Sequence, residues 1–208
     1  MWEHEVVGRI LEWWRSNKRV FPWRSARSPW LVLLAGVLLR KTGAKAVSSL
    51  YPRLASKYRS PEDVVKAGAR ELEEDLKPLG MYRRRARELV KLAEVLCSVH
   101  GGRVPRSRSK LLELPGVGDY IASVVLCYAY GERTPTIDTN TRRLVSRLAG
   151  VSESQVREVY ERLLKEARSP RELNLAMLDF AALVCRARRP RCESCPLADL
   201  CSTKLLSG

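Results

Sequence analysis

The chain has 208 residues, of which 45% are hydrophobic and 29% are charged. This is the composition of an ordinary globular protein that buries its own core, which excludes a chain that depends on disulfides to fold. Lysine and arginine number 38 against 23 aspartates and glutamates, so the net charge is +15. Such a surplus indicates a polyanionic partner, with nucleic acid as the first candidate, although the basic surface of a heat-adapted protein would give the same excess.

The longest apolar run is PWLVLLAGVLL at 29–39. It is shorter than the roughly 20 residues that span a bilayer, so it predicts a buried helix. The first residues, MWEHEVVGRILEWWRSNKR, are amphipathic and carry acids, which is not the pattern of a secretory signal. We therefore expect an intracellular protein, in the cytoplasm or nucleoid, whose six cysteines are not paired as disulfides.

Apolar residues recur at three- and four-residue spacing along most of the chain, which is the pattern of amphipathic helices. No stretch alternates with period two over the length of a strand, so the predicted fold class is all-α. In chain order, helices are expected at about 2–16, 30–40, 42–58, from 60, 69–80, 82–100, 108–114, 119–130, 140–149, 153–167 and 170–185. Gly80 and Gly101 are the predicted stops of the two central helices.

The stretch LPGVG at 114–118 lies between two of these helices. Pro115 ends the first helix, and the two glycines can take positive φ and let another backbone approach. The next helix begins with unpaired N–H groups and a partial positive charge. A plain Pro-Gly turn is the alternative, but the flanking helices favour the hairpin of a helix-hairpin-helix motif. The residues predicted to hold DNA phosphates in this cradle are Leu114, Gly116, Val117 and Gly118.

Four cysteines fall within the last 24 residues, separated by six, two and five positions: Cys185, Cys192, Cys195 and Cys201. Thiolates at this density in an intracellular chain are typical of a metal site. Zinc sites usually combine two C-x2-C pairs, and only one such pair is present, so the spacing favours a [4Fe–4S] cluster. The intervening RARRPR segment, with Arg189, can balance cluster charge and contact phosphates.

Three features together resemble the iron–sulfur branch of the helix-hairpin-helix DNA glycosylase superfamily, whose type member is endonuclease III. They are the LPGVG hairpin, an aspartate 20 residues after its second glycine, and C-x6-C-x2-C-x5-C at the end. The resemblance extends from FPWR at 21 to Cys201. It implies two helical lobes, 22–131 and 1–21 plus 132–208, with DNA bound in the cleft between them. It also implies a C-terminal [4Fe–4S] cluster loop and a catalytic aspartate, Asp138.

Two positions separate the members of this branch. Endonuclease III-like lyases carry a lysine two residues after the second hairpin glycine, where this chain has Tyr120, a poor Schiff-base former. Adenine glycosylases carry a catalytic glutamate where this chain has Gly36. The remaining similarity, in FPWR, LLRKT, LPGVGDY and RRPRCESC, is to mismatch glycosylases of thermophilic archaea that remove thymine or uracil opposite guanine.

The resemblance therefore implies a monomeric, monofunctional DNA glycosylase that acts on double-stranded DNA holding a mispaired or damaged base. Three alternatives stay open. They are a glycosylase with lyase activity on damaged pyrimidines, an adenine/8-oxoguanine mispair glycosylase, and a non-catalytic module that binds DNA structure.

Asp138 is expected to stabilise the oxocarbenium-like sugar of an extruded nucleotide or to orient the attacking water. The alternative role of Asp138 is to cap the helix that follows it. Tyr120 is expected at the wall of the base pocket or near the sugar. Arg40 and Lys41 occupy the turn where relatives place a wedge. The predicted phosphate contacts are Arg103, Arg106, Arg108, Arg142, Arg143, Arg188, Arg189 and Arg191. Trp23 and Trp30 are expected in the core.

Overall fold

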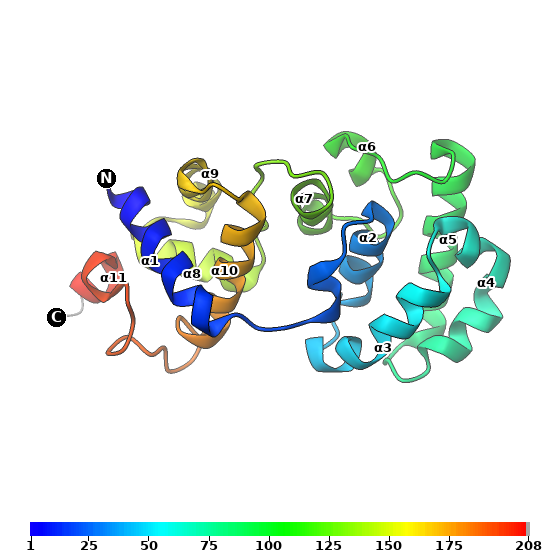
Figure 1. The fold of residues 1–208 in the computed structure, drawn as a ribbon, viewed down its shortest axis with the longest axis horizontal. Coiled ribbons are helices and arrows are strands. Elements are labelled where there is room, and N and C mark those ends of the chain that lie inside the picture. Colours follow the sequence, from blue (N-terminus) through cyan, green and yellow to red (C-terminus); the bar gives the residue numbers. More distant parts are fainter. Residues whose placement is uncertain (207–208) are drawn as a thin grey trace. The chain divides into compact units, whose positions relative to one another are not determined.

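The computed structural model describes residues 1–206 (Figure 1). The described residues form helices and turns and contain no strand, which confirms the all-α prediction. The chain divides into two compact units. Val20–Tyr130 is called the hairpin unit here, and Met1–Arg19 with Gly131–Gly208 is called the cysteine unit. Among the described residues, no helix is long and apolar enough to cross a membrane.

The hairpin unit contains the short 3₁₀ helix η1 and six α-helices: η1 (Pro22–Ser25), α2 (Pro29–Leu38), α3 (Ala44–Lys57), α4 (Pro61–Leu76), α5 (Tyr82–His100), α6 (Arg108–Leu112) and α7 (Asp119–Tyr128). A capping box starts α4, where the carboxylate of Asp63 accepts from the Ser60 N–H at 2.9 Å. Gly68 breaks α4 into two helical segments with φ of 70°. The break falls just before residue 69, where the sequence predicts a separate helix.

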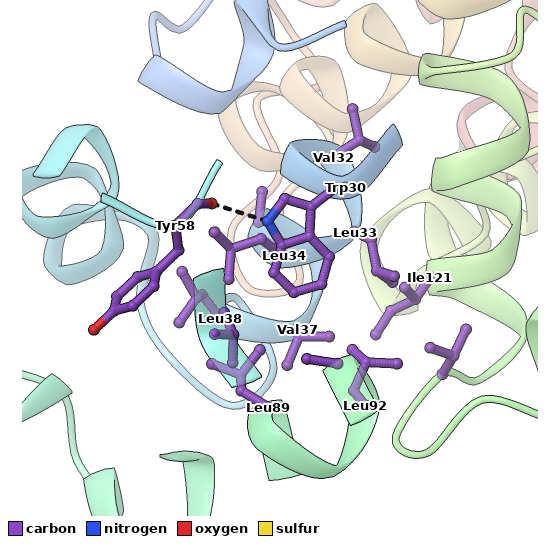
Figure 2. Packing of buried hydrophobic residues seen from close by; sticks show 14 of the residues in the cluster. Trp30, Val32, Leu33, Leu34, Val37, Leu38, Tyr58, Leu89, Leu92 and Ile121 are labelled. Carbon is purple, nitrogen blue, oxygen red and sulfur yellow. Dashed lines mark hydrogen bonds between the residues drawn. The ribbon is translucent and has the colours of Figure 1, made fainter. Parts of the chain in front are cut away.

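Helix α2 is apolar around most of its circumference and lies in the middle of the hairpin unit's core (Figure 2). Trp30 is 4% exposed, and its indole N–H donates to the Tyr58 carbonyl at 2.9 Å, as drawn in Figure 2. Trp23 is partly buried and packs edge-on against Tyr51. The prediction that both tryptophans belong to the core is confirmed.

The cysteine unit contains five α-helices and two 3₁₀ helices within its described residues: α1 (Trp2–Asn17), α8 (Thr139–Ala149), η2 (Glu153–Gln155), α9 (Val156–Glu166), α10 (Pro170–Leu183), η3 (Ala198–Leu200) and α11 (Ser202–Leu206). The sequence pattern did not predict α11. Helix α10 ends at Leu183, before the expected 185, so Cys185 lies in the loop after the helix.

A fully buried carboxylate, Asp179, fixes the end of α1 inside the cysteine unit. It accepts from the Trp14 indole at 2.8 Å, and from the Arg19 backbone N–H at 3.0 Å and Nε at 2.5 Å. A buried charge is tolerated only when it is paired and hydrogen-bonded, and these three donors meet that requirement. The N-terminal helix is therefore held firmly to α10.

Candidate active site

The LPGVG segment forms a tight turn between α6 and α7. The Val117 N–H donates to the Leu114 carbonyl at 3.1 Å, and Gly116 has φ of 75°. The side chains of Leu114 and Val117 are 2% and 6% exposed, so they anchor the turn in the core. Gly118 is the N-cap of α7 and gives that helix no side-chain cap, which leaves its first amides to other acceptors. The turn can therefore bind an anion through its main chain.

Arg40 braces this hairpin. Its Nη1 donates to the Gly116 carbonyl at 3.2 Å and lies 3.4 Å from a carboxylate oxygen of Glu88. A Cβ at Gly116 would lie 2.7 Å from that nitrogen and would displace the Arg40 guanidinium, while the positive φ of 75° favours glycine at this position. The guanidinium predicted to be a wedge or DNA contact is thus engaged with the protein.

Lys41 and Met81 are exposed residues that both adopt left-handed backbone conformations, with φ of 52° and 58°. They line one small cavity of about 50 Å³. Met81 is 54% exposed, and sequence reasoning missed it. Its only signal was an apolar residue in the turn between Gly80 and the next helix.

Tyr120 and Gly36 both lie in the hairpin unit. Tyr120 is in the first turn of α7, partly buried against the core. Gly36 is buried in α2, and a Cβ there would lie 3.2 Å from Cγ2 of Ile121. A glutamate at position 36 would need Ile121 to shift, so this core is built without an acid there.

Asp138 is the N-cap of α8. Its Oδ1 accepts from the backbone N–H groups of Asn140 at 2.9 Å and Thr141 at 2.7 Å, and the Thr141 hydroxyl lies 3.0 Å away. Its Oδ2 accepts from the Asn140 side chain at 3.2 Å. The capping role is confirmed. The cap fixes the orientation of a partly exposed carboxylate, which is also what an electrostatic catalyst needs.

Hydrogen bonds continue from this carboxylate to the first cysteine. Arg143 donates from Nη1 to the Asn140 side-chain oxygen at 3.1 Å, and from Nε and Nη2 to the Cys185 carbonyl at 3.1 and 3.0 Å. Nη2 also donates to the Ala181 carbonyl at 2.9 Å. Arg143 is half-buried, and its guanidinium is engaged with carbonyls of its own unit, so the predicted phosphate contact stays a prediction.

The four C-terminal cysteines line one cavity of about 300 Å³ whose walls are mostly apolar. Arg147 contacts two of them: its Nη1 lies 3.8 Å from Cys185 Sγ, and its carbonyl accepts from the Cys201 thiol at 3.4 Å. Burial raises the pKa of the Cys185 and Cys195 thiols. Within residues 1–206, no three His, Cys, Asp or Glu side chains are arranged closely enough to hold a metal ion as they stand.

The residues present nevertheless fit a thiolate-bound iron–sulfur cluster. Four sulfur donors border the same mostly apolar cavity, and one guanidinium lies beside them, which suits a soft, negatively charged group. Buried thiols resist ionisation on their own, and a metal is the partner that deprotonates them.

Other predicted phosphate contacts differ in their surroundings. Arg142 lies 3.6 Å from Glu153, with 42% of its side chain exposed. Arg108 pairs with Asp119 and also donates to the Ser123 hydroxyl at 3.2 Å. Arg189 is exposed and has φ of 50°. Arg189 is thus the most accessible of these three to a large polyanion.

Two protein-family models match this chain, one over the hairpin and one over the C-terminal cysteines. Residues 34–169 match the model described as HhH-GPD superfamily base excision DNA repair protein, and residues 185–201 match the iron–sulfur binding domain of endonuclease III. A thymine/uracil-DNA glycosylase of Methanothermobacter thermautotrophicus is 38% identical over 94% of this chain and 91% of its own length.

Two solved structures are similar over nearly the whole chain. One is described as a thermostable thymine-DNA glycosylase, at a TM-score of 0.92 and 36% identity, covering 98% of this chain and 97% of that one. The other is a non-covalent endonuclease III–DNA complex, at a TM-score of 0.79 and 31% identity, covering 97% and 94%.

Proposed function

This chain belongs to the HhH-GPD superfamily of base excision DNA repair proteins and is a DNA glycosylase; from that premise we propose that it hydrolyses the N-glycosidic bond of thymine or uracil mispaired with guanine. The observation that carries the proposal is the fixed carboxylate of Asp138. The chain has Tyr120 at the position where a covalent lyase would need a lysine amine to attack the sugar. The thymine and thymine/uracil relatives support the choice of base.

Chemistry on a stacked base first requires extrusion of its nucleotide, at a cost of a few kcal/mol that a mismatch lowers. Departure of the base then leaves positive charge on the sugar. Asp138 stabilises this charge through Oδ2 or uses that oxygen to orient water, while the helix cap keeps Oδ1 fixed. Tyr120 contacts the extruded nucleotide from the first turn of α7. No covalent enzyme–sugar intermediate is needed.

DNA binding begins with the main-chain amides of the hairpin, where Gly116 and Gly118 permit close approach of a phosphate. Met81 enters the stack as an apolar wedge, and Lys41 lies beside it. Arg142 and Arg189 contribute phosphate contacts from the cysteine unit. Arg40 acts through its hydrogen bond to the hairpin.

We further propose that Cys185, Cys192, Cys195 and Cys201 hold a [4Fe–4S] cluster. When bound, the cluster supplies a four-point covalent link between the loop after α10 and the C-terminal segment. Arg147 then donates toward the Cys185 sulfur, and Arg143 holds the Cys185 carbonyl against α8. Through Arg143 and Arg147, the cysteines that would hold the cluster are linked to the helix that Asp138 caps.

The test is single-turnover base release from T·G, U·G and T·A duplexes by wild type and Asp138→Asn. Asparagine still caps a helix but carries no charge, so we expect a loss of roughly 10²- to 10³-fold with little change in stability. Asp63→Asn, which changes a capping carboxylate of α4, is the matched control and should retain activity. Equal base release by wild type and Asp138→Asn would remove the catalytic assignment.

A further inference from the structure

Arg85 is a buried cation whose guanidinium is held mainly by main-chain carbonyls. It lies in the first turn of α5 and is 7% exposed. Its Nε donates to the Gly80 carbonyl at 2.9 Å and its Nη2 to the Arg40 carbonyl at 2.8 Å. Nη2 also bonds the Thr42 hydroxyl, and Nη1 lies 3.4 Å from the Leu38 carbonyl. Burying a charged group costs free energy, so the positions of the carbonyls that compensate it indicate what the buried Arg85 does.

Those carbonyls belong to two separate turns. Leu38 and Arg40 lie at the C-terminal end of α2, where main-chain carbonyls lack helical partners and carry the negative end of the helix dipole. Gly80 lies in the turn before α5. One guanidinium thus joins the turn at 38–42 to the turn at 80–81.

Each turn contains an exposed residue in a left-handed conformation, namely Lys41 in the first and Met81 in the second. For a residue with a Cβ this conformation is sterically unfavourable. Such strain persists only where the surrounding structure imposes it, and it concentrates at functional sites. The side chains of Lys41 and Met81 line the same small cavity as Arg85.

We propose that Arg85 is a positioning residue that locks the turns at 38–42 and 80–81 together, so that Lys41 and Met81 enter the DNA stack as one rigid two-pronged wedge. The inference rests on the proposed function. A lysine cannot replace this arginine, because only the planar guanidinium reaches acceptors on both turns at once. These hydrogen bonds extend to the hairpin. The Arg40 carbonyl accepts from Arg85, and the Arg40 guanidinium donates to the Gly116 carbonyl.

Loss of Arg85 should impair extrusion of the base and leave cleavage of the glycosidic bond unchanged. A uracil in single-stranded DNA needs no wedge, because it is already unpaired. Arg85→Gln and Arg85→Lys should therefore slow single-turnover release from a U·G duplex by about 10- to 100-fold. Release from a single-stranded uracil oligonucleotide should change by less than about threefold, well within the scatter expected of remote changes. Fluorescence of 2-aminopurine beside the target should show reduced extrusion in the same variants.

Arg87→Gln is the matched control, because it removes the same charge from an exposed position of the same helix. It should leave both substrates unaffected. An equal loss on duplex and single-stranded DNA by Arg85→Lys would overturn the proposal, as would full activity of Arg85→Lys on the duplex.

A double-mutant cycle keeps the test decisive if Arg85→Gln does not fold. If Arg85 acts through Met81, Arg85→Lys should add little to the loss caused by Met81→Ala on the duplex. Fully additive losses would contradict that route. Failure of the proposed function is distinguishable, because a wild type that releases neither base still reports extrusion through 2-aminopurine fluorescence.

Discussion

The hairpin unit and the cysteine unit present their candidate functional groups in opposite ways. In the hairpin unit the exposed elements are turns, namely the main chain of LPGVG and the two turns that carry Lys41 and Met81, and the side chains of Arg40 and Arg85 hold them from behind. In the cysteine unit the exposed element is a side chain, the Asp138 carboxylate, held by main-chain amides. Binding a uniform phosphate backbone needs amides and shape, whereas stabilising charge at one atom needs one fixed carboxylate.

The two units also differ in how their cores are filled. The hairpin unit has a continuous apolar core around α2. The core of the cysteine unit borders a cavity of about 300 Å³ lined by four thiols. If this cavity holds the proposed cluster, we expect the cysteine unit to depend on a bound group for its final structure and the hairpin unit to fold without one.

The strongest way to break this comparison is to remove the cluster. Cys192→Ser should abolish binding of about four iron ions per chain, together with absorbance near 400 nm, because it removes one of four ligands. Limited proteolysis should then cut the cysteine unit while the hairpin unit resists. Cys97→Ser, in α5 of the hairpin unit, is the matched control and should keep its iron. A colourless wild type with one zinc would refute the cluster.

Arg143→Lys tests whether catalysis by Asp138 depends on the hydrogen bonds that connect its helix to Cys185 at the cavity. Lysine keeps the charge but cannot donate at once to Asn140, Ala181 and Cys185, so we expect base release to fall by about 10-fold or more while DNA affinity is retained. Arg162→Lys, at an arginine of α9 in the same unit whose side chain is 45% exposed, is the control and should change the rate by less than about twofold. An Arg143→Lys enzyme with wild-type rates would show that the connection has no catalytic consequence.

Arginines mark the limit of what the sequence could predict. Periodicity located the helices, and the fixed spacings of LPGVG and of the cysteines predicted the hairpin and the metal ligands. In the run Arg83-Arg84-Arg85, however, composition gives three equal cations, and only the last is buried. Arg142 and Arg143 are both half-buried, but Arg143 donates to the carbonyls of Ala181 and Cys185, whereas Arg142 lies beside Glu153. Which guanidinium faces inward is decided by carbonyls of distant segments, and no local pattern records those contacts.

Met81 was missed for a related reason. A single apolar residue in a turn predicts nothing, because isolated exposed apolar residues are common. It gains meaning only beside Lys41, forty residues away in the chain, with which it shares a cavity and a backbone conformation.

Gly116→Ala sharpens the claim that the hairpin unit works through its backbone. The new Cβ would meet both a positive φ and the Arg40 guanidinium, so the free energy of unfolding should fall by about 1–2 kcal/mol or more. Gly118→Ala is the comparison variant, since its φ is −99° and nothing lies within 4 Å of an added Cβ. Denaturant unfolding should therefore show a much smaller loss for Gly118→Ala. Equal losses would mean that the turn does not depend on the left-handed conformation of Gly116.

The smallest expected effect concerns a single exposed charge of the cysteine unit. If Arg189 contacts one phosphate, Arg189→Gln should reduce the slope of log affinity against log salt by about 0.9, with the base-release rate at saturating enzyme unchanged. Arg143→Gln should leave that slope unaltered, because its guanidinium faces the protein interior. The pair of slopes distinguishes an arginine that binds DNA from one that builds the unit. A reversed pattern would place the phosphate contact on α8 instead of the loop before Cys192.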